Sequence, residues 1–222
     1  REVERKLGVG TPARDGKVTA DCMTGVEVTR DTLGGETVTR YRTPVGTVQT
    51  RHRGSEVLDS AGIQGRETES LIKSLDDYRV VQYMVEHTEV EPTYDAYLSY
   101  EKDIGEEGVP MVKLGDCPMG MVLKEYIGWG RAYLELADNP DAVERLSAAV
   151  RELMREKVRL AAASPARLFL LGEHFHSQMT SPPLFAKYFV PDCQEFAAAL
   201  HAAGKQMTCH ADADASLLLE LI

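Results

Sequence analysis

From about residue 67 onward the chain alternates helical segments with short apolar runs, and this alternation constrains the fold more than any other feature of the sequence. The apolar run at 109–115 is typical of a buried strand, residues 167–172 form the next predicted strand, and residues 205–209 form a third short one. The clearest helix between them begins at Asn139-Pro140-Asp141, with apolar residues following at helical spacing. Strand, helix and strand in this order predict parallel strands joined by crossover helices. A (β/α) barrel and a doubly wound sheet both fit this order.

The first part of the chain has a different pattern. Residues 36–41 and 45–50 alternate polar and apolar side chains with the period of two that suits half-buried strands. Thr43-Pro44-Val45-Gly46 lies between them, with Pro and Gly placed for a turn. These features predict an antiparallel hairpin, with residues 25–28 as a candidate third strand.

Composition and charge exclude several classes of protein. The 222 residues carry a formal net charge of −10, which argues against a nucleic-acid partner because phosphate binding needs surplus Lys and Arg on one face. No apolar run approaches the roughly 18 residues of a membrane span, and residues 1–10 show no secretory signal. The four cysteines form no C-x-x-C pair, so we interpret them as reduced thiols, mostly buried, in a cytoplasmic protein.

Residues with chemical potential follow each of the three predicted parallel strands. Asp116 follows the first strand, Glu173-His174-Phe175-His176 follows the second, and His210-Ala211-Asp212 follows the third. Function gathers at the carboxyl ends of strands in parallel α/β folds. We therefore expect His210, Asp212 and Glu173 to bind one divalent ion, because neutral imidazole and carboxylates are common metal ligands.

Each of these residues also has a structural interpretation. Asp116 and Asp212 are suited to capping the next helix, and Asp214 is better explained as a cap than as a ligand. Glu173 would also serve as a buried ion-pair partner. If the strand continues, His174 and His176 face opposite sides, so only one of them points inward.

Three segments together resemble a known family. They are residues 173–191, residues 200–205 and His210-Ala211-Asp212. They are similar to the uroporphyrinogen decarboxylase (URO-D) superfamily, which includes the decarboxylase and the cobalamin-dependent methyltransferases that use zinc to activate a thiol. The resemblance covers about Lys73 to Ile222. The turn at 43–47 is similar to the hairpin extension of the methyltransferase branch.

The resemblance implies a fold and a domain organisation. The expected fold class is α/β, a (β/α)8 TIM barrel that is incomplete in this chain, with an N-terminal antiparallel β-hairpin extension. The expected domains are residues 1–64 for the extension and 65–222 for the partial URO-D-like barrel. Since a complete barrel has about 250 residues, we expect the chain to be part of a longer protein.

The resemblance also implies an activity. His210 matches the zinc-binding His of the methyltransferase branch, whereas Asp212 stands where that branch has Cys. The implied enzyme transfers a methyl group from a corrinoid protein to a small acceptor such as a thiol, with Zn²⁺ as cofactor. We assign catalytic roles to Glu173, His174 and Asp212. We assign substrate binding to Asp116 and His176. The proposed metal ligands are His210, Asp212 and Glu173.

Two alternatives remain open at the level of sequence. The first is a uroporphyrinogen decarboxylase-type carboxy-lyase acting on a tetrapyrrole. Its polycarboxylate substrate needs Arg or Lys in the pocket, whereas the predicted strand ends carry acids and histidines, which suit a cation. The second is a non-catalytic corrinoid- or tetrapyrrole-binding protein, suggested by Asp212 in place of Cys.

Overall fold

The computed structural model describes residues 2–10, 13–54, 57, 60, 65–172, 175–211 and 214–221. The chain divides into two compact units. Unit 1 comprises Arg1–Cys22, Val90–Pro118 and Arg151–Ile222, and unit 2 comprises Met23–Glu89 and Met119–Val150. Each unit is described by itself.

Unit 1 contains the parallel strands and most of the helices. Its elements are α1 (Glu2–Leu7), α4 (Tyr94–Ile104), η1 (Gly105–Glu107), β7 (Met111–Gly115), β8 (Leu168–Leu171), α8 (Pro182–Leu184), η3 (Phe185–Phe189), α9 (Val190–Ala202), β9 (Gln206–Thr208) and η4 (Ser216–Leu218). Four further elements have residues in both units: β1 (Thr19–Met23), β6 (Thr88–Pro92), α5 (Pro118–Gly120) and α7 (Pro140–Ala163). Strands β1 and β6 form a two-stranded sheet that the sequence analysis did not predict.

Strands β7, β8 and β9 form a three-stranded parallel sheet in that order. Phe169 at its centre pairs with Val112 on one side and with Met207 on the other. Residues 169–171 of β8 are all buried, as expected for a central strand covered on both faces. The sheet confirms the three parallel strands predicted from the sequence.

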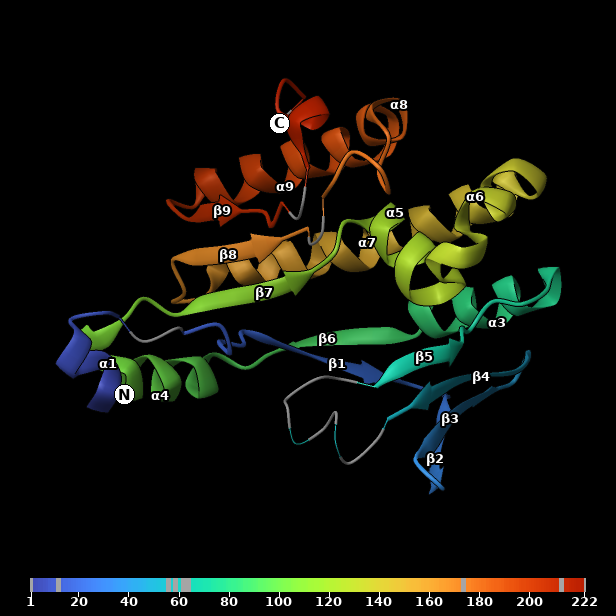
Figure 1. Ribbon diagram of the computed structural model, residues 1–222, viewed down its shortest axis with the longest axis horizontal. Coiled ribbons are helices and arrows are strands. Elements are labelled where there is room, and N and C mark those ends of the chain that lie inside the picture. Colours follow the sequence, from blue (N-terminus) through green and yellow to red (C-terminus); the bar gives the residue numbers. More distant parts are fainter. Residues whose placement is uncertain are drawn as a thin grey trace. The chain divides into compact units, whose positions relative to one another are not determined.

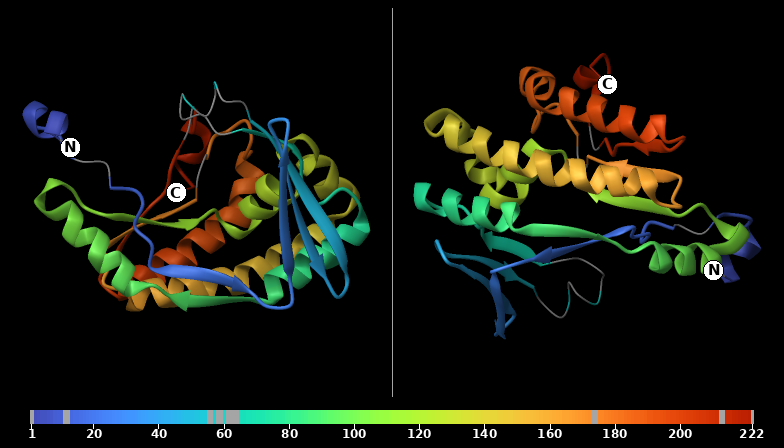
Figure 2. Two further views of the ribbon diagram at one scale, coloured as in Figure 1. Left: turned by 90° about the horizontal axis from the view of Figure 1, so that it is seen from below. Right: turned by 180° about the vertical axis from the view of Figure 1, so that it is seen from behind.

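Helices α7 and α9 are the long crossover helices between these strands. The part of α7 in unit 1 and α9 both lie behind the strands in Figure 1 and in front of them in Figure 2, right, so they cover the same face of the sheet. Ion pairs Arg151–Asp192 and Arg155–Glu195 join the two helices. Helix α9 ends before Gly204, whose φ of 71° is the left-handed conformation that glycine favours at helix ends. No helix in the described part of the chain is both long and apolar enough to cross a membrane.

Unit 2 is built on an antiparallel sheet. Its elements are β2 (Glu27–Leu33), β3 (Glu36–Thr43), β4 (Gly46–Arg53), β5 (Arg66–Glu69), α3 (Leu75–Glu86), η2 (Met121–Ile127) and α6 (Trp129–Asp138). The strands pair in sequence order, and Thr43 pairs with Gly46 across the predicted turn. Helix α3 begins after Ser74, and its Asp77 carboxylate accepts the Ser74 amide at 2.8 Å.

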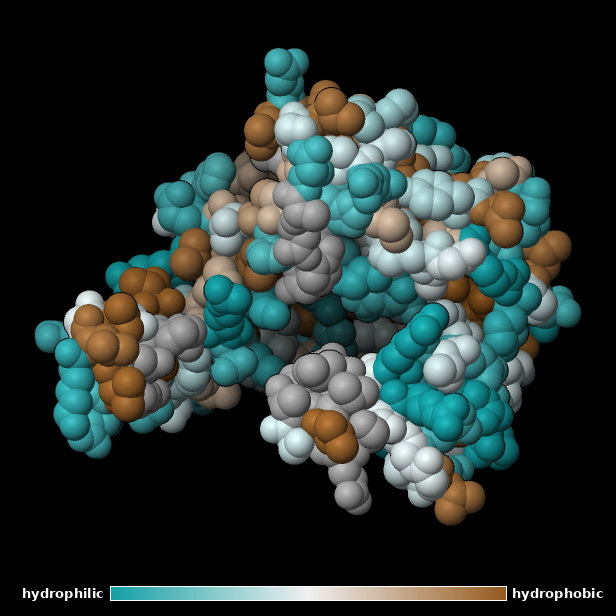
Figure 3. All heavy atoms as spheres, in the orientation of Figure 1, coloured by the Kyte–Doolittle hydropathy of each residue, from teal (hydrophilic) through white to brown (hydrophobic). Residues whose placement is uncertain are grey.

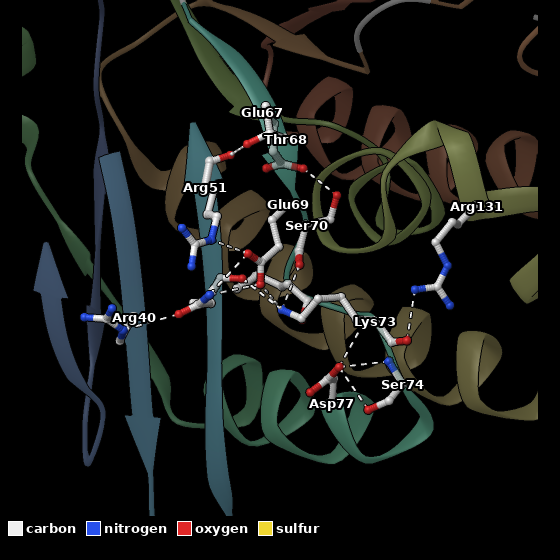
Figure 4. Close-up of polar contacts among 12 residues, drawn as sticks. Arg40, Arg51, Glu67, Thr68, Glu69, Ser70, Lys73, Ser74, Asp77 and Arg131 are labelled. Atoms are coloured by element: carbon white, nitrogen blue, oxygen red, sulfur yellow. Dashed lines mark hydrogen bonds and ion pairs between the residues drawn. The ribbon is translucent and has the colours of Figure 1, made fainter. Parts of the chain in front are cut away.

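A ladder of polar side chains crosses the strands of unit 2 (Figure 4). Arg40 donates to Gln49, and Gln49 donates to Glu69 at 3.1 and 3.2 Å. Glu69 also accepts from Arg51 at 2.6 Å and lies 3.0 Å from the Lys73 ammonium. Hydrophilic side chains gather over β3 and β4 in the space-filling view (Figure 3). Such cross-strand pairs help to set the register, although each exposed pair contributes no more than about 1 kcal/mol.

The predicted (β/α)8 TIM barrel is wrong. The described strands form three separate sheets, and β7 and β9 are the ends of a three-stranded order, so no closed barrel is present among them. Strands β2 to β5 pair antiparallel with their neighbours in sequence, whereas every strand of the predicted barrel would pair parallel. The N-terminal hairpin is likewise one part of a four-stranded sheet. Periodicity identifies strands one at a time, whereas barrel closure requires a matched tilt and stagger of all strands, which no local pattern encodes.

Glu135 is the hub of a buried polar network in unit 2, and its substitution should destabilise the protein. Its carboxylate accepts from Tyr78 Oη and Asn139 Nδ2, each at 2.9 Å, and pairs with Arg131. We expect Glu135→Gln to lower the free energy of unfolding by about 1–3 kcal/mol, because the amide removes the charge that these donors share. Glu86→Gln, the same change at an exposed residue of α3, should cost less than about 0.5 kcal/mol. Urea denaturation measures both values, and equal losses would contradict the proposed network.

Candidate functional site

The segments that follow β7, β8 and β9 are joined by backbone hydrogen bonds. The Gly172 amide donates to the Gly115 carbonyl at 3.0 Å, and the His210 amide donates to the Gly172 carbonyl at 3.1 Å. The Phe175 amide then donates to the His210 carbonyl at 3.1 Å, and Phe175 bridges Ala211 in parallel. The carboxyl ends of the three strands therefore meet along one edge of the sheet in unit 1.

Three of the residues proposed from the sequence lie outside the described residues. These are Glu173, His174 and Asp212. Their catalytic roles, and the roles of Glu173 and Asp212 as metal ligands, stay predictions. Asp116, His176 and His210 are described and lie at the three strand ends.

Asp116 is a buried carboxylate anchored to its own loop. Its side chain is 4% exposed, and its Oδ1 accepts the amide of Cys117 at 2.8 Å. This local bond favours a role in shaping the turn between β7 and α5. Substrate binding by Asp116 stays a prediction.

His176 is half-buried and belongs to the turn after β8. Its Nδ1 lies 3.4 Å from the Met179 amide, and its carbonyl accepts the Thr180 amide at 2.9 Å. When Nδ1 accepts this bond, the neutral ring carries its proton on Nε2. Nε2 is then the nitrogen available to donate to a ligand.

His210 directly follows Cys209 and has an exposed side chain. Its backbone amide and carbonyl are both fixed by the bonds to Gly172 and Phe175, so the chain holds the residue firmly while the imidazole faces solvent. The neighbouring Asp214 accepts the Ser216 amide at 2.9 Å, but the N-cap of η4 is Ala215, so Asp214 orders the turn before this helix and is not its cap. The two bonds with Ser216 lower the pKa of Asp214.

Three cysteines gather at the same end of the sheet, although the sequence analysis gave them no functional role. Cys117 follows β7, Cys193 lies in the first turns of α9, and Cys209 follows β9. The Sγ atoms of Cys117 and Cys193 are 3.4 Å apart, and all four cysteines are free. The positions of Cys117, two residues after one predicted strand, and of Cys209, at the end of another, were the one signal in the sequence that pointed to this end. Cys193, on a helix, had none.

Cys193 and Cys209 border a cavity of about 360 Å³, which is large enough for a small molecule. The described lining is mostly apolar and consists of Phe175, Phe185, Val190, Cys193, Gln194, Ala197, Met207, Thr208, Cys209 and Leu221. Phe175 packs edge-on against Phe185, with ring centroids 5.1 Å apart. The cavity therefore favours a small, largely uncharged ligand.

The surroundings of Cys117 keep its thiol protonated. The hydrogen bond with Cys193 is the largest cause of its raised pKa, followed by complete burial and by the charges of Asp116 and Asp192. Asp192 is itself buried and shares its carboxylate between Nε and Nη2 of Arg151. Burial likewise raises the pKa of the Cys209 thiol, with the neighbouring Cys193 adding to it.

Known proteins were compared with the chain by family, by sequence and by structure, and matches were found among solved structures. No protein-family model matches the chain, and no curated protein matches it. A solved methyltransferase from Methanosarcina mazei is similar to the chain with a TM-score of 0.46 and 11% sequence identity. The alignment covers 71% of this chain and 46% of that protein, so the chain spans less than half of its length.

Gly172 controls the position of Phe175 at the cavity. Its φ is 82°, and a Cβ at this position would overlap the Phe175 ring. Gly204 has a similar φ of 71° but has open space around it. We expect Gly204→Ala to cost about 1–2 kcal/mol of unfolding free energy from backbone strain, and Gly172→Ala to cost a further 1–3 kcal/mol, roughly, from the overlap. Urea denaturation of both variants checks this, and equal losses would show that Phe175 yields freely.

The protonated Cys117 thiol should make stability decrease in alkali. The folded-state pKa lies above the ordinary value of 9.0, so its contribution is complete below about pH 9 and is lost as the pH rises further. In reducing buffer, Cys117→Ala should therefore flatten the fall in unfolding free energy between about pH 8.5 and 10, by at most roughly 1.4 kcal/mol per pH unit. Cys22→Ala, at an exposed cysteine, should keep the wild-type slope. Identical slopes in all three proteins would refute the assignment.

Proposed function

We propose that the chain belongs to an enzyme of the URO-D superfamily that transfers a methyl group from a corrinoid protein to a small acceptor such as a thiol. The reacting groups would lie at the carboxyl ends of β7, β8 and β9. The proposed ligands of a zinc ion are His210, Glu173 and Asp212, and the proposed substrate contacts are Asp116 and His176.

One observation supports this proposal more than any other. Gly172 and Phe175, which flank positions 173 and 174 in the sequence, both bond to the backbone of His210. The loops after two neighbouring strands, which carry the proposed imidazole and carboxylate ligands in their sequences, are therefore joined at their bases. Adjacent strand ends are where parallel α/β proteins assemble sites from distant residues.

Of the three proposed zinc ligands, only His210 is among the residues that the structure describes. The described residues contain no group of three or more His, Cys, Asp and Glu side chains that would hold a metal ion. His210 is the described member of the proposed set, and it is an exposed residue at the carboxyl end of β9. When bound, zinc would act as a Lewis acid that lowers the pKa of an acceptor thiol.

The chain's own residues would bind and shield the acceptor. Phe175, Phe185 and Met207 give the cavity an apolar wall that excludes water from a bound small molecule. Gln194 and Thr208 are polar residues of the lining, and their side chains would orient the bound acceptor by hydrogen bonding. His176 would hold or donate a proton through Nε2 if the acceptor reaches the turn after β8.

The cavity also bears on the decarboxylase alternative. None of its described lining residues is cationic, and the nearby Arg151 is already paired with the buried Asp192. A polycarboxylate substrate would bring several negative charges to these walls without compensation. We therefore favour methyl transfer over tetrapyrrole decarboxylation.

Zinc analysis of purified variants tests the metal proposal. We expect zinc bound to the wild-type protein and to His201→Ala, because His201 is exposed near the end of α9 and belongs to no proposed site. His210→Ala should reduce the zinc content to background, because loss of an imidazole removes one of three protein ligands. Equal zinc in the two variants, or none in the wild type, would refute the assignment.

Methyl transfer is measured separately. Demethylation of methylcobalamin in the presence of a small thiol, followed by absorbance, should be seen with the wild type and His201→Ala and be lost with His210→Ala. Turnover of uroporphyrinogen by metal-free protein would instead select the decarboxylase.

A further inference from the structure

Two thiols of unit 1 meet in a position that the proposed methyl transfer does not use. The Sγ atoms of Cys117 and Cys193 are 3.4 Å apart, although the residues are 76 positions apart in the sequence. Cys117 lies at the end of β7 and is fully buried, whereas Cys193 is half-buried and borders the cavity. One sulfur is thus reached from the cavity, and the other lies directly behind it.

We propose that Cys117 and Cys193 form a redox-active dithiol, which a small-molecule disulfide entering the cavity oxidises to an internal disulfide. The dithiol does not require the proposed metal or methyl transfer, although Cys193 lines the cavity proposed for the acceptor.

The difference in exposure between the two thiols indicates which of them reacts first. Cys193 is the entry thiol, because a reagent in the cavity meets its sulfur. Cys117 is the resolving thiol, because it is fully buried and its sulfur contacts that of Cys193. Its raised pKa, caused first by the hydrogen bond with Cys193 and then by burial, also disfavours it as the first nucleophile.

The chemistry balances with a disulfide RSSR as the oxidant. The Cys193 thiolate attacks one sulfur of RSSR, the S–S bond breaks, and the released RS⁻ takes up the proton that Cys193 lost. Cys117, after losing its proton, attacks Sγ of Cys193 in the mixed disulfide, and the second RS⁻ leaves with that proton. Two protein thiols and one RSSR become one internal disulfide and two RSH.

The movement required is small. The sulfurs must approach from 3.4 Å to about 2.05 Å, the length of a disulfide bond. Cys193 lies just after the π-helical segment η3 (Phe185–Phe189), a type of helix that is less regular than an α-helix. Since Cys193 is part of the cavity wall, oxidation would also change the space offered to a ligand.

Cys209 is the competing partner, because it borders the same cavity and interacts electrostatically with Cys193. Its pKa is raised chiefly by burial. The contact of 3.4 Å favours Cys117. An experiment must therefore distinguish a 117–193 bond from a 193–209 bond.

Disulfide mapping of the wild-type protein makes this distinction without any substitution. Trypsin, which cleaves after Lys and Arg, places Cys117 in peptide 114–124, Cys193 in 188–205 and Cys209 in 206–222. After treatment with 2-hydroxyethyl disulfide and blocking of free thiols, we expect peptides 114–124 and 188–205 to be linked. Dithiothreitol should reverse the link. A link between 188–205 and 206–222, or mixed disulfides alone, would overturn the proposal.

Substitutions provide the matched controls. Cys209→Ser and Cys22→Ser should keep the internal disulfide. Cys117→Ser should leave a stable mixed disulfide on Cys193, and Cys193→Ser should leave Cys117 unmodified because its entry thiol is gone. If Cys117→Ser does not fold, the wild-type map and Cys209→Ser still decide the question, since loss of the 114–124 link in either contradicts it.

Discussion

The parallel hydrogen bonding of β7, β8 and β9 is the constraint on which the candidate site depends. Parallel strands point their carboxyl ends the same way, so the loops after them are forced to one edge of the sheet. Here the pairing continues past the strands, through the bonds that Gly172 makes with Gly115 and His210. Every group assigned a role in unit 1 is positioned by that edge or by the helix leading to β9.

At this edge of the sheet, backbone segments held by hydrogen bonds lie beside an apolar cavity. Gly172 takes a left-handed conformation that leaves room for the Phe175 ring, and that ring forms part of the wall of the cavity. Arg151 and Asp192 form an ion pair with each other, and neither residue is part of the described cavity lining. An apolar cavity bordered by thiols is chemically suited to sulfur ligands, and this links the proposed thiol acceptor and the proposed dithiol through one property of the site.

Unit 2 is stabilised in a different way. Strand β2 of its sheet is exposed throughout, and the ladder through Gln49 and Glu69 crosses strands that also carry the buried Val38 and Val48. The buried Glu135 network supplies a polar anchor on the helical side. Exposed pairs of this kind add little stability, so register and turn geometry, such as Thr43 opposite Gly46, carry the specificity of the sheet.

The sequence by itself determined the local elements. Three apolar runs became β7, β8 and β9, the turn at 43–46 became a hairpin, and Gly204 ended α9, because strand periodicity, turn chemistry and helix caps act over a few residues. Tertiary structure decided what depends on distant partners. It replaced the expected barrel with separate sheets, added the β1–β6 pair, and brought Cys117 to Cys193. The spacing of residues in the sequence does not predict such contacts, because they form only when a strand end and a crossover helix pack against each other.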